Sequence, residues 1–244
     1  MIFQDFCTKC GEIFAHNSAV PMPTQEQIEK LFDLTNIMLE VNKSMNLTAI
    51  TEENAIILRH YVDCASICGK IFEKAKLIDV GCGAGFPSLV LAIFRADVEI
   101  TGLDGTAKRI DYVNSTAKKL GLNNVTAIAA RAEEAGKSAV YREKFDVVTA
   151  RAVASLPVLC EICLPFAKVG GKFIAMKASQ GQSEVATASQ AITLCGGNLS
   201  DVELFSISPD GREFEQRTVI TITKSTPTPQ KYPRHYSQIS KKPL

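Results

Sequence analysis

The sequence predicts an α/β fold with a Rossmann-like, mostly parallel, doubly wound sheet. We also expect an antiparallel edge hairpin and an N-terminal helical cap. From residue 75 onward short apolar runs alternate with helix-length segments, a glycine-dense turn follows the first run, and no helix separates the last two runs. Strands that alternate with helices pair in parallel through right-handed crossovers, whereas strands joined directly form a hairpin.

The N-terminal part of the chain divides into two segments. Residues 1–23 are expected to form an irregular extension that ends in a proline-rich stretch. Thr24 and Gln27 then form a capping box, which marks the start of a helix. A second helix is expected at 52–70, so that residues 24–74 form the helical cap.

Residues 75–224 form the sheet domain. Short apolar runs predict strands, and apolar residues at helical spacing predict the helices between them. The expected strands are 76–80, 98–103, 125–129, 145–150, 171–177, 201–208 and 217–224. The expected helices are 87–95, 107–120, 132–139, 154–168 and 181–196.

Composition restricts the class of protein. A chain of 244 residues with 46% hydrophobic and 22% charged residues can bury one large α/β core. No apolar run approaches the ~20 residues of a membrane span, and the N-terminus lacks the basic and apolar regions of a signal peptide. We therefore expect a cytoplasmic protein with no membrane partner.

The glycine turn is the most informative stretch. Gly81, Gly83 and Gly85 follow a strand that contains Asp79. Glycines let the backbone approach a ligand closely, and the N-terminus of the next helix adds partial positive charge. A dinucleotide-binding turn would need its third glycine at the position of Phe86. The G-x-G-x-G form instead resembles the S-adenosylmethionine loop of Rossmann-like methyltransferases.

Asp104 ends the next strand, about 20 residues past the glycines. At that distance an acid accepts hydrogen bonds from ribose hydroxyls. Asp104 could also cap the helix that begins near Ala107. The two roles are compatible.

The eight cysteines are expected to be thiols, because the chain shows no export signal. Cys7 and Cys10 look like half of a zinc knuckle, and Cys160 and Cys163 supply a second pair. The second pair lies on the apolar side of an expected helix, where cysteine acts as a small packing residue. We expect no metal site.

Residues 225–244 are expected to form a basic tail after a linker at 225–229. The segment from residue 231 contains several basic residues, no acid, and interleaved aromatic rings. This pattern suits phosphate contacts and base stacking, although a solvated tail has a similar composition. The candidate RNA-binding residues of the tail are Arg234, His235, Lys241 and Lys242.

Several short sequence motifs, taken in order, resemble those of the glucose-inhibited division protein B family, also named ribosomal RNA small-subunit methyltransferase G. The matching words are Met45 to Ile50, Arg59 to Asp63, the glycine turn with Phe86-Pro87, Leu103-Asp104, Lys108-Arg109, Arg131 to Glu133, Arg151 to Ala154, Lys177, Tyr232 to His235 and Lys241 to Leu244. The ordered set is more specific than any single motif. Small-for-small departures from the family pattern occur at Cys64, Ser88, Gly105 and Ala178.

The resemblance implies a class I S-adenosylmethionine-dependent methyltransferase that modifies N7 of a guanine. It implies 16S ribosomal RNA or the small ribosomal subunit as the partner. We also expect a monomer. For the cofactor it implies close backbone approach at Gly81, packing by Phe86, ribose contacts at Asp104, and an adenine site at Ala132 and Glu133. Gly83 and Gly85 complete the loop.

Arginines are the expected residues on the substrate side. The resemblance places Arg151 where the target base is presented and also close to the cofactor, and it makes Arg131 a second candidate. Structural ion pairs with Asp146 or Glu133 are the alternative for these two arginines. Lys177 is expected to join the basic tail in a small RNA-binding face.

Guanine N7 carries a lone pair and no proton, so positioning and electrostatic preorganisation should supply most of the catalysis. His60 is therefore expected to orient the cap or to contact phosphate, and not to act as a base. In A-form RNA N7 faces a groove that side chains cannot enter, so the target should be a loop or an unstacked base.

Two other functions fit parts of the sequence. A small-molecule methyltransferase would share the glycine turn but would have no use for the basic tail. A non-catalytic RNA-binding assembly factor would need the tail and would tolerate a damaged turn, which here is intact.

Overall fold

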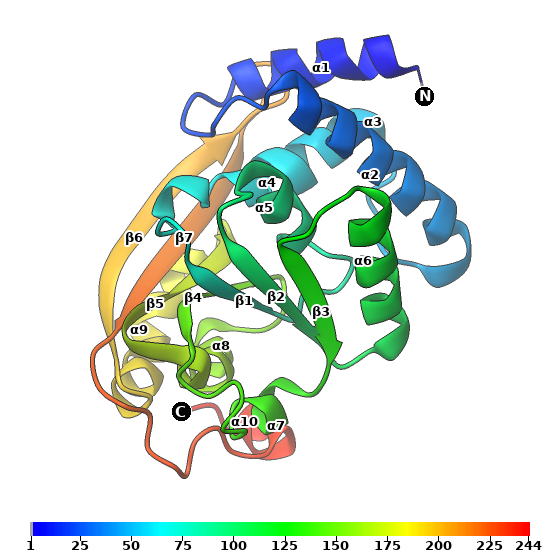
Figure 1. Cartoon of the computed structure of the whole chain (residues 1–244). Helices are drawn as coiled ribbons and strands as arrows, with labels where there is room; N and C mark the ends of the chain where they lie inside the picture. The colour runs from blue at the N-terminus through cyan, green and yellow to red at the C-terminus, as the bar shows by residue number, and fades with distance from the viewer. Residues whose placement is uncertain (1) are drawn as a thin grey trace.

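The computed structural model describes residues 2–244 and contains one seven-stranded mixed sheet (Figure 1). Its strand order is β3-β2-β1-β4-β5-β7-β6. The strands are β1 (Lys76–Val80), β2 (Glu99–Asp104), β3 (Val125–Ala129), β4 (Phe145–Arg151), β5 (Ala167–Ala178), β6 (Gly197–Ile207) and β7 (Glu215–Lys224). The first five pair in parallel, and β7 is antiparallel to both β5 and β6. The predicted class I fold with an antiparallel edge is confirmed.

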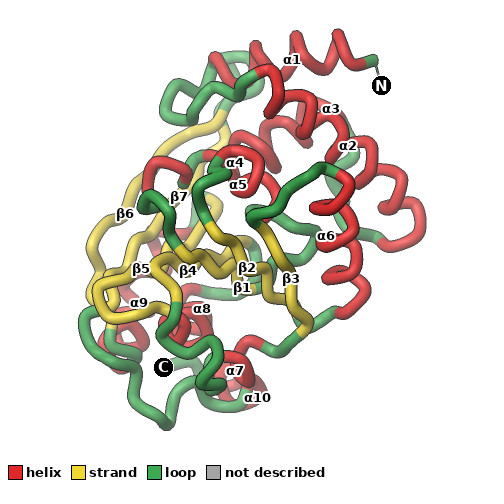
Figure 2. Tube along the Cα trace, viewed as in Figure 1, coloured by secondary structure: helices red, strands yellow, loops and turns green. Residues whose placement is uncertain are grey.

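Helices cover both faces of the sheet, which forms the central layer (Figure 2). They are α5 (Ser88–Phe94), α6 (Ala107–Lys119), α7 (Ala132–Ala135), α8 (Leu156–Cys163) and α9 (Gly181–Leu194). Alternate residues of β1 serve different cores, because side chains of a strand point to opposite faces. Leu77 belongs to the core with α5 and α6, and Ile78 to the core with α8 and α9. The expected helices at 132–139 and 154–168 end earlier than predicted.

The N-terminal extension is helical, contrary to expectation. Residues Phe3–Ala15 form α1, whose Phe6, Cys10, Ile13 and Phe14 are buried. Their spacing gives one apolar stripe along the helix, which packs on the cap. Pro21 and Pro23 lie several residues beyond the end of α1 at Ala15, so they do not prevent this helix. This signal was present in the sequence.

The cap itself follows the prediction. Helix α2 (Gln25–Met45) begins at the Thr24–Gln27 capping box, with both reciprocal hydrogen bonds formed. The second cap helix is interrupted: α3 (Glu53–Ile56) leads into a π-helical turn, Ile57–Val62, and then into α4 (Asp63–Ala65). Such wide turns are frequent at functional sites.

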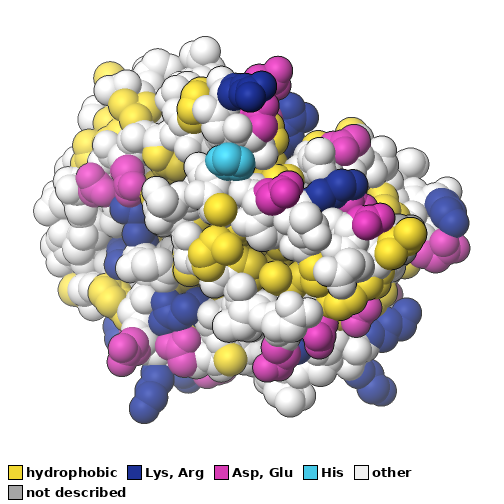
Figure 3. Space-filling model, turned by 90° about the horizontal axis from the view of Figure 1, so that it is seen from above, with side chains coloured by type: hydrophobic (Ala, Val, Ile, Leu, Met, Phe, Trp, Pro, Cys, Tyr) yellow, Lys and Arg dark blue, Asp and Glu magenta, His cyan; other side chains and the backbone are white. Residues whose placement is uncertain are grey.

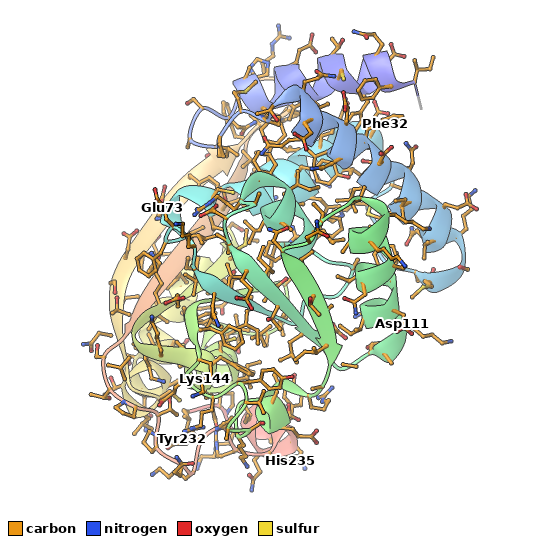
Figure 4. The ribbon with its side chains drawn as sticks, viewed as in Figure 1. Phe32, Glu73, Asp111, Lys144, Tyr232 and His235 are labelled. Atoms are coloured by element: carbon orange, nitrogen blue, oxygen red, sulfur yellow. The ribbon has the colours of Figure 1, made fainter. Side chains whose placement is uncertain are left out.

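The C-terminal segment, residues 225–244, is neither a linker nor a free tail. Thr228, Tyr232 and Ile239 are buried, and α10 (Tyr236–Lys241) packs against α8. Figure 4 shows Tyr232 and His235 at the same end of the molecule as α7 and α10 in Figure 1. The expectation of a linker and a basic tail outside the folded domain therefore fails, because the apolar residues of the segment pack on the domain surface.

Two further features bear on partners. None of the helices within residues 2–244 is long and apolar enough to cross a membrane. On the face seen from above, basic side chains are interspersed with acidic and apolar ones (Figure 3). That face offers no continuous basic surface to a polyanion.

Candidate active site

A cavity of about 250 Å³ lies at the carboxyl ends of β1, β2 and β3, and we call it the strand-end cavity. This is where open α/β sheets bind ligands. Its lining combines backbone, two carboxylates and apolar side chains. The lining residues are Val80, Gly81, Leu103, Asp104, Gly105, Thr106, Arg109, Ala130, Arg131, Ala132, Glu133, Val153, Ile162 and Tyr236.

Of the three turn glycines, only Gly81 lines the strand-end cavity. All three have positive φ, +79°, +54° and +86° in order, which is costly for other residues. A Cβ on Gly81 would lie 2.5 Å from a methyl carbon of Val153, and one on Gly85 would lie 2.5 Å from Leu89. Gly83 and Gly85 thus shape the turn, whereas Gly81 also forms the cavity surface.

Asp104 is held by two backbone hydrogen bonds, but the N-cap of α6 is Thr106, so the alternative capping role is not taken by Asp104. One carboxylate oxygen accepts from the backbone N–H of Thr106 at 2.8 Å, and the other accepts from Gly83 N–H at 3.1 Å. The carboxylate therefore ties the glycine turn to the start of α6. Because a carboxylate accepts several hydrogen bonds, it can still accept from hydroxyls in the cavity that it lines.

The far end of the strand-end cavity is built around α7. Ala132 and Glu133 form its first turn, and the Glu133 side chain is buried. Arg131 Nε lies 3.5 Å from a Glu133 oxygen, so the ion pair considered as an alternative role for Arg131 is present. Ile162 and Tyr236 supply apolar surface opposite.

Phe86 and Arg151 lie outside the strand-end cavity, although both were expected beside the cofactor. The Phe86 ring stacks on the His60 ring, with centroids 4.3 Å apart and planes 6° apart. The Arg151 guanidinium carbon lies 5.7 Å from the centre of the Phe86 ring. Arg151 lines a neighbouring cavity, whereas Phe86 contacts His60 and Arg151.

A second cavity of about 510 Å³ lies beside the first, and we call it the arginine cavity. Its lining is rich in paired charges from the cap, β4, β5, α9 and β7. The lining residues are Ile50, Arg59, Asp63, Arg151, Ala152, Met176, Lys177, Ala178, Gln180, Gly181, Glu184, Glu215 and Arg217.

Five of these residues form an alternating chain of ion pairs, the arginine–carboxylate network. It runs Arg59, Glu215, Arg217, Asp63, Arg151, with N···O distances of 2.7, 2.8, 3.0 and 2.9 Å between successive members. Arg151 also donates to the carbonyl oxygen of Arg59 at 2.9 Å. Asp146, considered only as an alternative partner of Arg151, pairs with Lys168 instead.

His60 supports Arg151 from the cap. Its Nδ1 lies 3.2 Å from Arg151 Nη2, and its Nε2 lies 3.1 Å from the Thr48 hydroxyl. Arginine can only donate, so Nδ1 accepts and the proton of the neutral ring is on Nε2. Burial, with the charge of Arg151, lowers the pKa of His60 to about 3. The ring is therefore neutral at physiological pH and cannot take up a proton there.

Two residues expected to contact RNA are engaged inside the protein. Lys177 Nζ donates to the carbonyl oxygen of Ala154 at 2.8 Å and pairs with Glu184 at 2.9 Å. Arg234 pairs with the fully buried Glu161 at 2.6 Å. Arg234 thus serves the fold, a correction to its expected role. His235, Lys241 and Lys242 are exposed.

Short-range sequence signals missed two lining residues. Arg217 comes from the edge hairpin, 154 positions from its partner Asp63, and only the sheet order brings the two together. Tyr236 was interpreted as an RNA-stacking residue, whereas it lines the strand-end cavity. No local pattern in the sequence could have assigned either position.

The cysteines follow the packing prediction. Cys160 and Cys163 are buried in α8, and burial raises the pKa of both thiols. Within residues 2–244 no group of three or more His, Cys, Asp or Glu residues could hold a metal ion. Cys10, on the buried face of α1, also belongs to the core.

The residues of the strand-end cavity fit an adenosyl group. A carboxylate faces the cavity at Asp104, the backbone is bare at Gly81, and Leu103 and Ile162 offer flat apolar surface. Among solved structures, a methyltransferase from Bacillus halodurans aligns with a TM-score of 0.52 at 14% identity, over 67% of this chain and 99% of that one. A SAM-dependent methyltransferase from Methanosarcina mazei aligns with a TM-score of 0.51 at 16% identity, over 65% and 96%. The fold is that of the class I S-adenosylmethionine-dependent methyltransferases.

Sequence comparison narrows the class to one family. The family model described as "GidB: rRNA small subunit methyltransferase G" matches residues 27–213. Proteins named ribosomal RNA small subunit methyltransferase G are similar over the whole domain. The one from Acetivibrio thermocellus is 44% identical over 90% of this chain and 89% of its own length. The one from Desulfitobacterium hafniense is 42% identical over 90% of each. The chain belongs to the rRNA small subunit methyltransferase G family.

Proposed function

We propose that this protein transfers a methyl group from S-adenosylmethionine to N7 of a guanine in 16S ribosomal RNA. The observation that carries the proposal is the junction of the two cavities at the end of β4. Val153 lines the strand-end cavity, and Ala152 and Arg151 line the arginine cavity. A donor held in the first cavity and a base held in the second would be separated only by this short segment.

In this proposal the strand-end cavity holds the cofactor, which supplies an activated methyl group on a sulfonium. Gly81 allows close backbone approach, and Asp104 accepts from the ribose hydroxyls. Ala132 and Glu133 face the adenine ring, where a backbone N–H and a carboxylate match its edge. These residues bind and orient, and none of them needs to move a proton.

The arginine cavity would hold the target nucleotide. Arg151 is fixed by Asp63, by the Arg59 carbonyl and by His60, so its planar guanidinium has little freedom to rotate. A fixed planar donor suits guanine O6 or a phosphate oxygen. The carboxylate of Glu184, which lines the same cavity, is an acceptor suited to the guanine amino group.

No general base is required. Guanine N7 attacks with its own lone pair, so catalysis rests on alignment and on the electrostatics of the site. The neutral state of His60, with a pKa of about 3, is consistent with such a mechanism. We assign His60 a positioning role, because it contacts Arg151 and stacks on Phe86.

RNA would reach the arginine cavity as a loop or an unstacked base, because a duplex buries N7 in a groove closed to side chains. Of the basic residues first expected to contact RNA, we retain His235, Lys241 and Lys242, which are exposed. We propose a monomer that works in the cytoplasm on the small ribosomal subunit or its RNA.

The test maps guanine N7 methylation in ribosomal RNA from cells with and without the gene, by cleavage at methylated sites and primer extension. One site in 16S RNA should lose its modification in the deletion strain. Adding purified enzyme and S-adenosylmethionine to RNA or subunits from that strain should restore it. An unchanged 16S pattern together with intact cofactor binding would contradict the proposed substrate.

A further inference from the structure

The C-terminal segment is fastened to the sheet domain by two arginines. Arg142 donates to the carbonyl oxygens of Thr228 at 2.6 Å, Pro229 at 3.3 Å and Tyr232 at 3.0 Å. It also donates to Gly136 O at 2.9 Å, just after α7. One guanidinium therefore connects the residue after α7 with three backbone carbonyl groups of the segment.

Arg234 makes the second attachment, to α8. Its side chain donates to both oxygens of Glu161 at 2.8 and 2.6 Å, and its backbone N–H donates to the same carboxylate at 2.9 Å. Glu161 is fully buried. A buried carboxylate needs its partner, because an unpaired charge there is costly. The position where α10 begins is therefore set by α8.

These attachments bring Tyr236, the first residue of α10, to the strand-end cavity. Tyr236 lines it together with Ile162, the residue next to Glu161 on α8. The Arg131 guanidinium carbon lies 5.3 Å from the centre of the Tyr236 ring, and Arg131 lines the same cavity. The Tyr236 ring is thus positioned by the Arg131 guanidinium and by α10, in the cavity that Ala132 and Glu133 also line.

We propose that the C-terminal segment closes the adenine end of the cofactor site, with the Tyr236 ring as its contact surface for the base. The proposal rests on the proposed assignment of the strand-end cavity to S-adenosylmethionine. Aromatic side chains stack on any base through its π-face, and such contacts strengthen binding by about ten- to a hundredfold. The ligand group that Tyr236 contacts is therefore a nucleoside base, here the adenine of the cofactor.

Coupling between the ligand and the segment follows from this arrangement. If the base packs on Tyr236, then cofactor binding stabilises the docked segment. Loss of docking lowers the affinity for the cofactor by the same factor by which the cofactor favours docking. The outer residues His235, Lys241 and Lys242 stay exposed. The segment would then carry the base-contacting ring on one side and its remaining basic residues on the other.

Calorimetric titration with S-adenosylhomocysteine and with adenosine tests the contact. Tyr236→Ala should weaken both ligands by the same factor, about tenfold or more. Tyr236→Phe keeps the ring and should bind as the wild type. Ser240→Ala, at an exposed position on the same helix, is the matched control and should also bind as the wild type. Should the alanine variant fail to fold, Tyr236→Leu takes its place with the same expected loss.

Each other outcome is decisive. Wild-type affinity in Tyr236→Ala overturns the proposal, as does a loss confined to S-adenosylhomocysteine with adenosine binding intact. If the wild type binds neither ligand, the assignment of the cavity itself is wrong, which is a separate failure. Hydrogen exchange gives the second readout: S-adenosylhomocysteine should slow exchange of amides in residues 232–241 of the wild type and should not do so in Tyr236→Ala.

Discussion

The strand-end cavity and the arginine cavity lie side by side but are built in different ways. The first is formed by a glycine turn, strand ends and the start of a helix, mostly within residues 80–133. The second is formed by long charged side chains that come from residues 50 to 217. One site relies on backbone shape, and the other relies on ion pairs between distant segments.

This difference has a physical basis. A backbone turn positions N–H groups without bringing charges into the interior, so it needs little support from elsewhere. Charged side chains in a cavity must be paired, because an isolated buried charge is costly. The arginine–carboxylate network meets that requirement, since Asp63 bridges Arg151 and Arg217. We therefore expect mutations in the two cavities to affect different steps.

The largest effect should come from Arg151→Ala. The single-turnover rate should fall by about 100-fold or more, because the base loses its fixed partner. Affinity for S-adenosylhomocysteine should change little, since Arg151 does not line the strand-end cavity. Rapid-quench kinetics and calorimetry measure the two quantities. Arg59→Ala, at the half-exposed end of the network, is the control and should lose less. Equal losses of rate and affinity in Arg151→Ala would show that the two cavities act as one site.

Asp104→Ala should produce the opposite pattern. Losing charge-assisted hydrogen bonds should weaken S-adenosylhomocysteine by about 1–3 kcal/mol, whereas the rate at saturating cofactor should remain near that of the wild type. The melting temperature should also fall, because Asp104 accepts from Gly83 and Thr106. Asp104→Asn keeps an acceptor and should recover part of the stability. Unchanged affinity in folded Asp104→Ala would refute the ribose assignment.

Alanine substitutions at two glycines of the same turn should have smaller effects, which differ between the two positions. Gly81→Ala places a methyl group 2.5 Å from Val153, on the cavity surface, and should weaken S-adenosylhomocysteine by roughly tenfold. At Gly83 the nearest atom to an added Cβ is 3.9 Å away, so Gly83→Ala should cost only about 1–2 kcal/mol of stability for its left-handed backbone. Calorimetry and thermal unfolding measure both variants. Equal affinity losses would mean that the whole turn, and not Gly81 alone, contacts the ligand.

The exposed lysines of the C-terminal segment should contribute modestly to RNA binding. Lys241→Ala with Lys242→Ala should reduce the salt dependence of RNA affinity by about one unit of slope per lost phosphate contact. Cofactor affinity should stay constant. Lys118→Ala with Lys119→Ala, which removes two exposed lysines at the end of α6, controls for net charge. A full salt slope in the double variant would place the basic face elsewhere.

The smallest effect is expected for wild-type stability between about pH 4 and 6. Burial lowers the pKa of His60 from 6.5 to about 3, so its contribution is full above 6.5 and is lost as the pH falls toward 3. Burial raises the pKa of Asp79, beneath the glycine turn, from 3.8 to about 6. Its contribution is therefore full below 3.8 and is lost as the pH rises through 6. The two slopes oppose each other in this window.

Removing either titratable group should reveal the pH dependence of stability that comes from the other. Relative to the wild type, Asp79→Asn should lose about 1.4 kcal/mol of unfolding free energy per unit of pH on acidification from 6 to 4. His60→Gln should show the reverse slope. Urea unfolding at several pH values measures both. Parallel curves for the variants and the wild type would contradict the assigned protonation states.

Most of the sheet domain could be predicted because its signals are local. The alternation of strands and helices, the capping box at Thr24 and the edge hairpin each depend on a few neighbouring residues, and the structure confirms them. Helix α1 differs from the expected irregular extension, although Phe6, Cys10, Ile13 and Phe14 form an apolar stripe at helical spacing. The strand-end position of Asp104 also followed from local spacing, whereas Glu133 was named through the family resemblance; both line the strand-end cavity.

Local sequence patterns predict the fold class, the glycine turn and the acid that follows it, because short-range backbone geometry imposes each of them. Tertiary structure alone decided that Arg217 reaches Asp63, that Arg234 neutralises Glu161, and that the C-terminal segment docks with Tyr236 at the strand-end cavity. The reason is that a charged or aromatic side chain takes its role from whatever partner the fold brings to it. Composition shows that such residues are present but not which buried charge or ring they will meet.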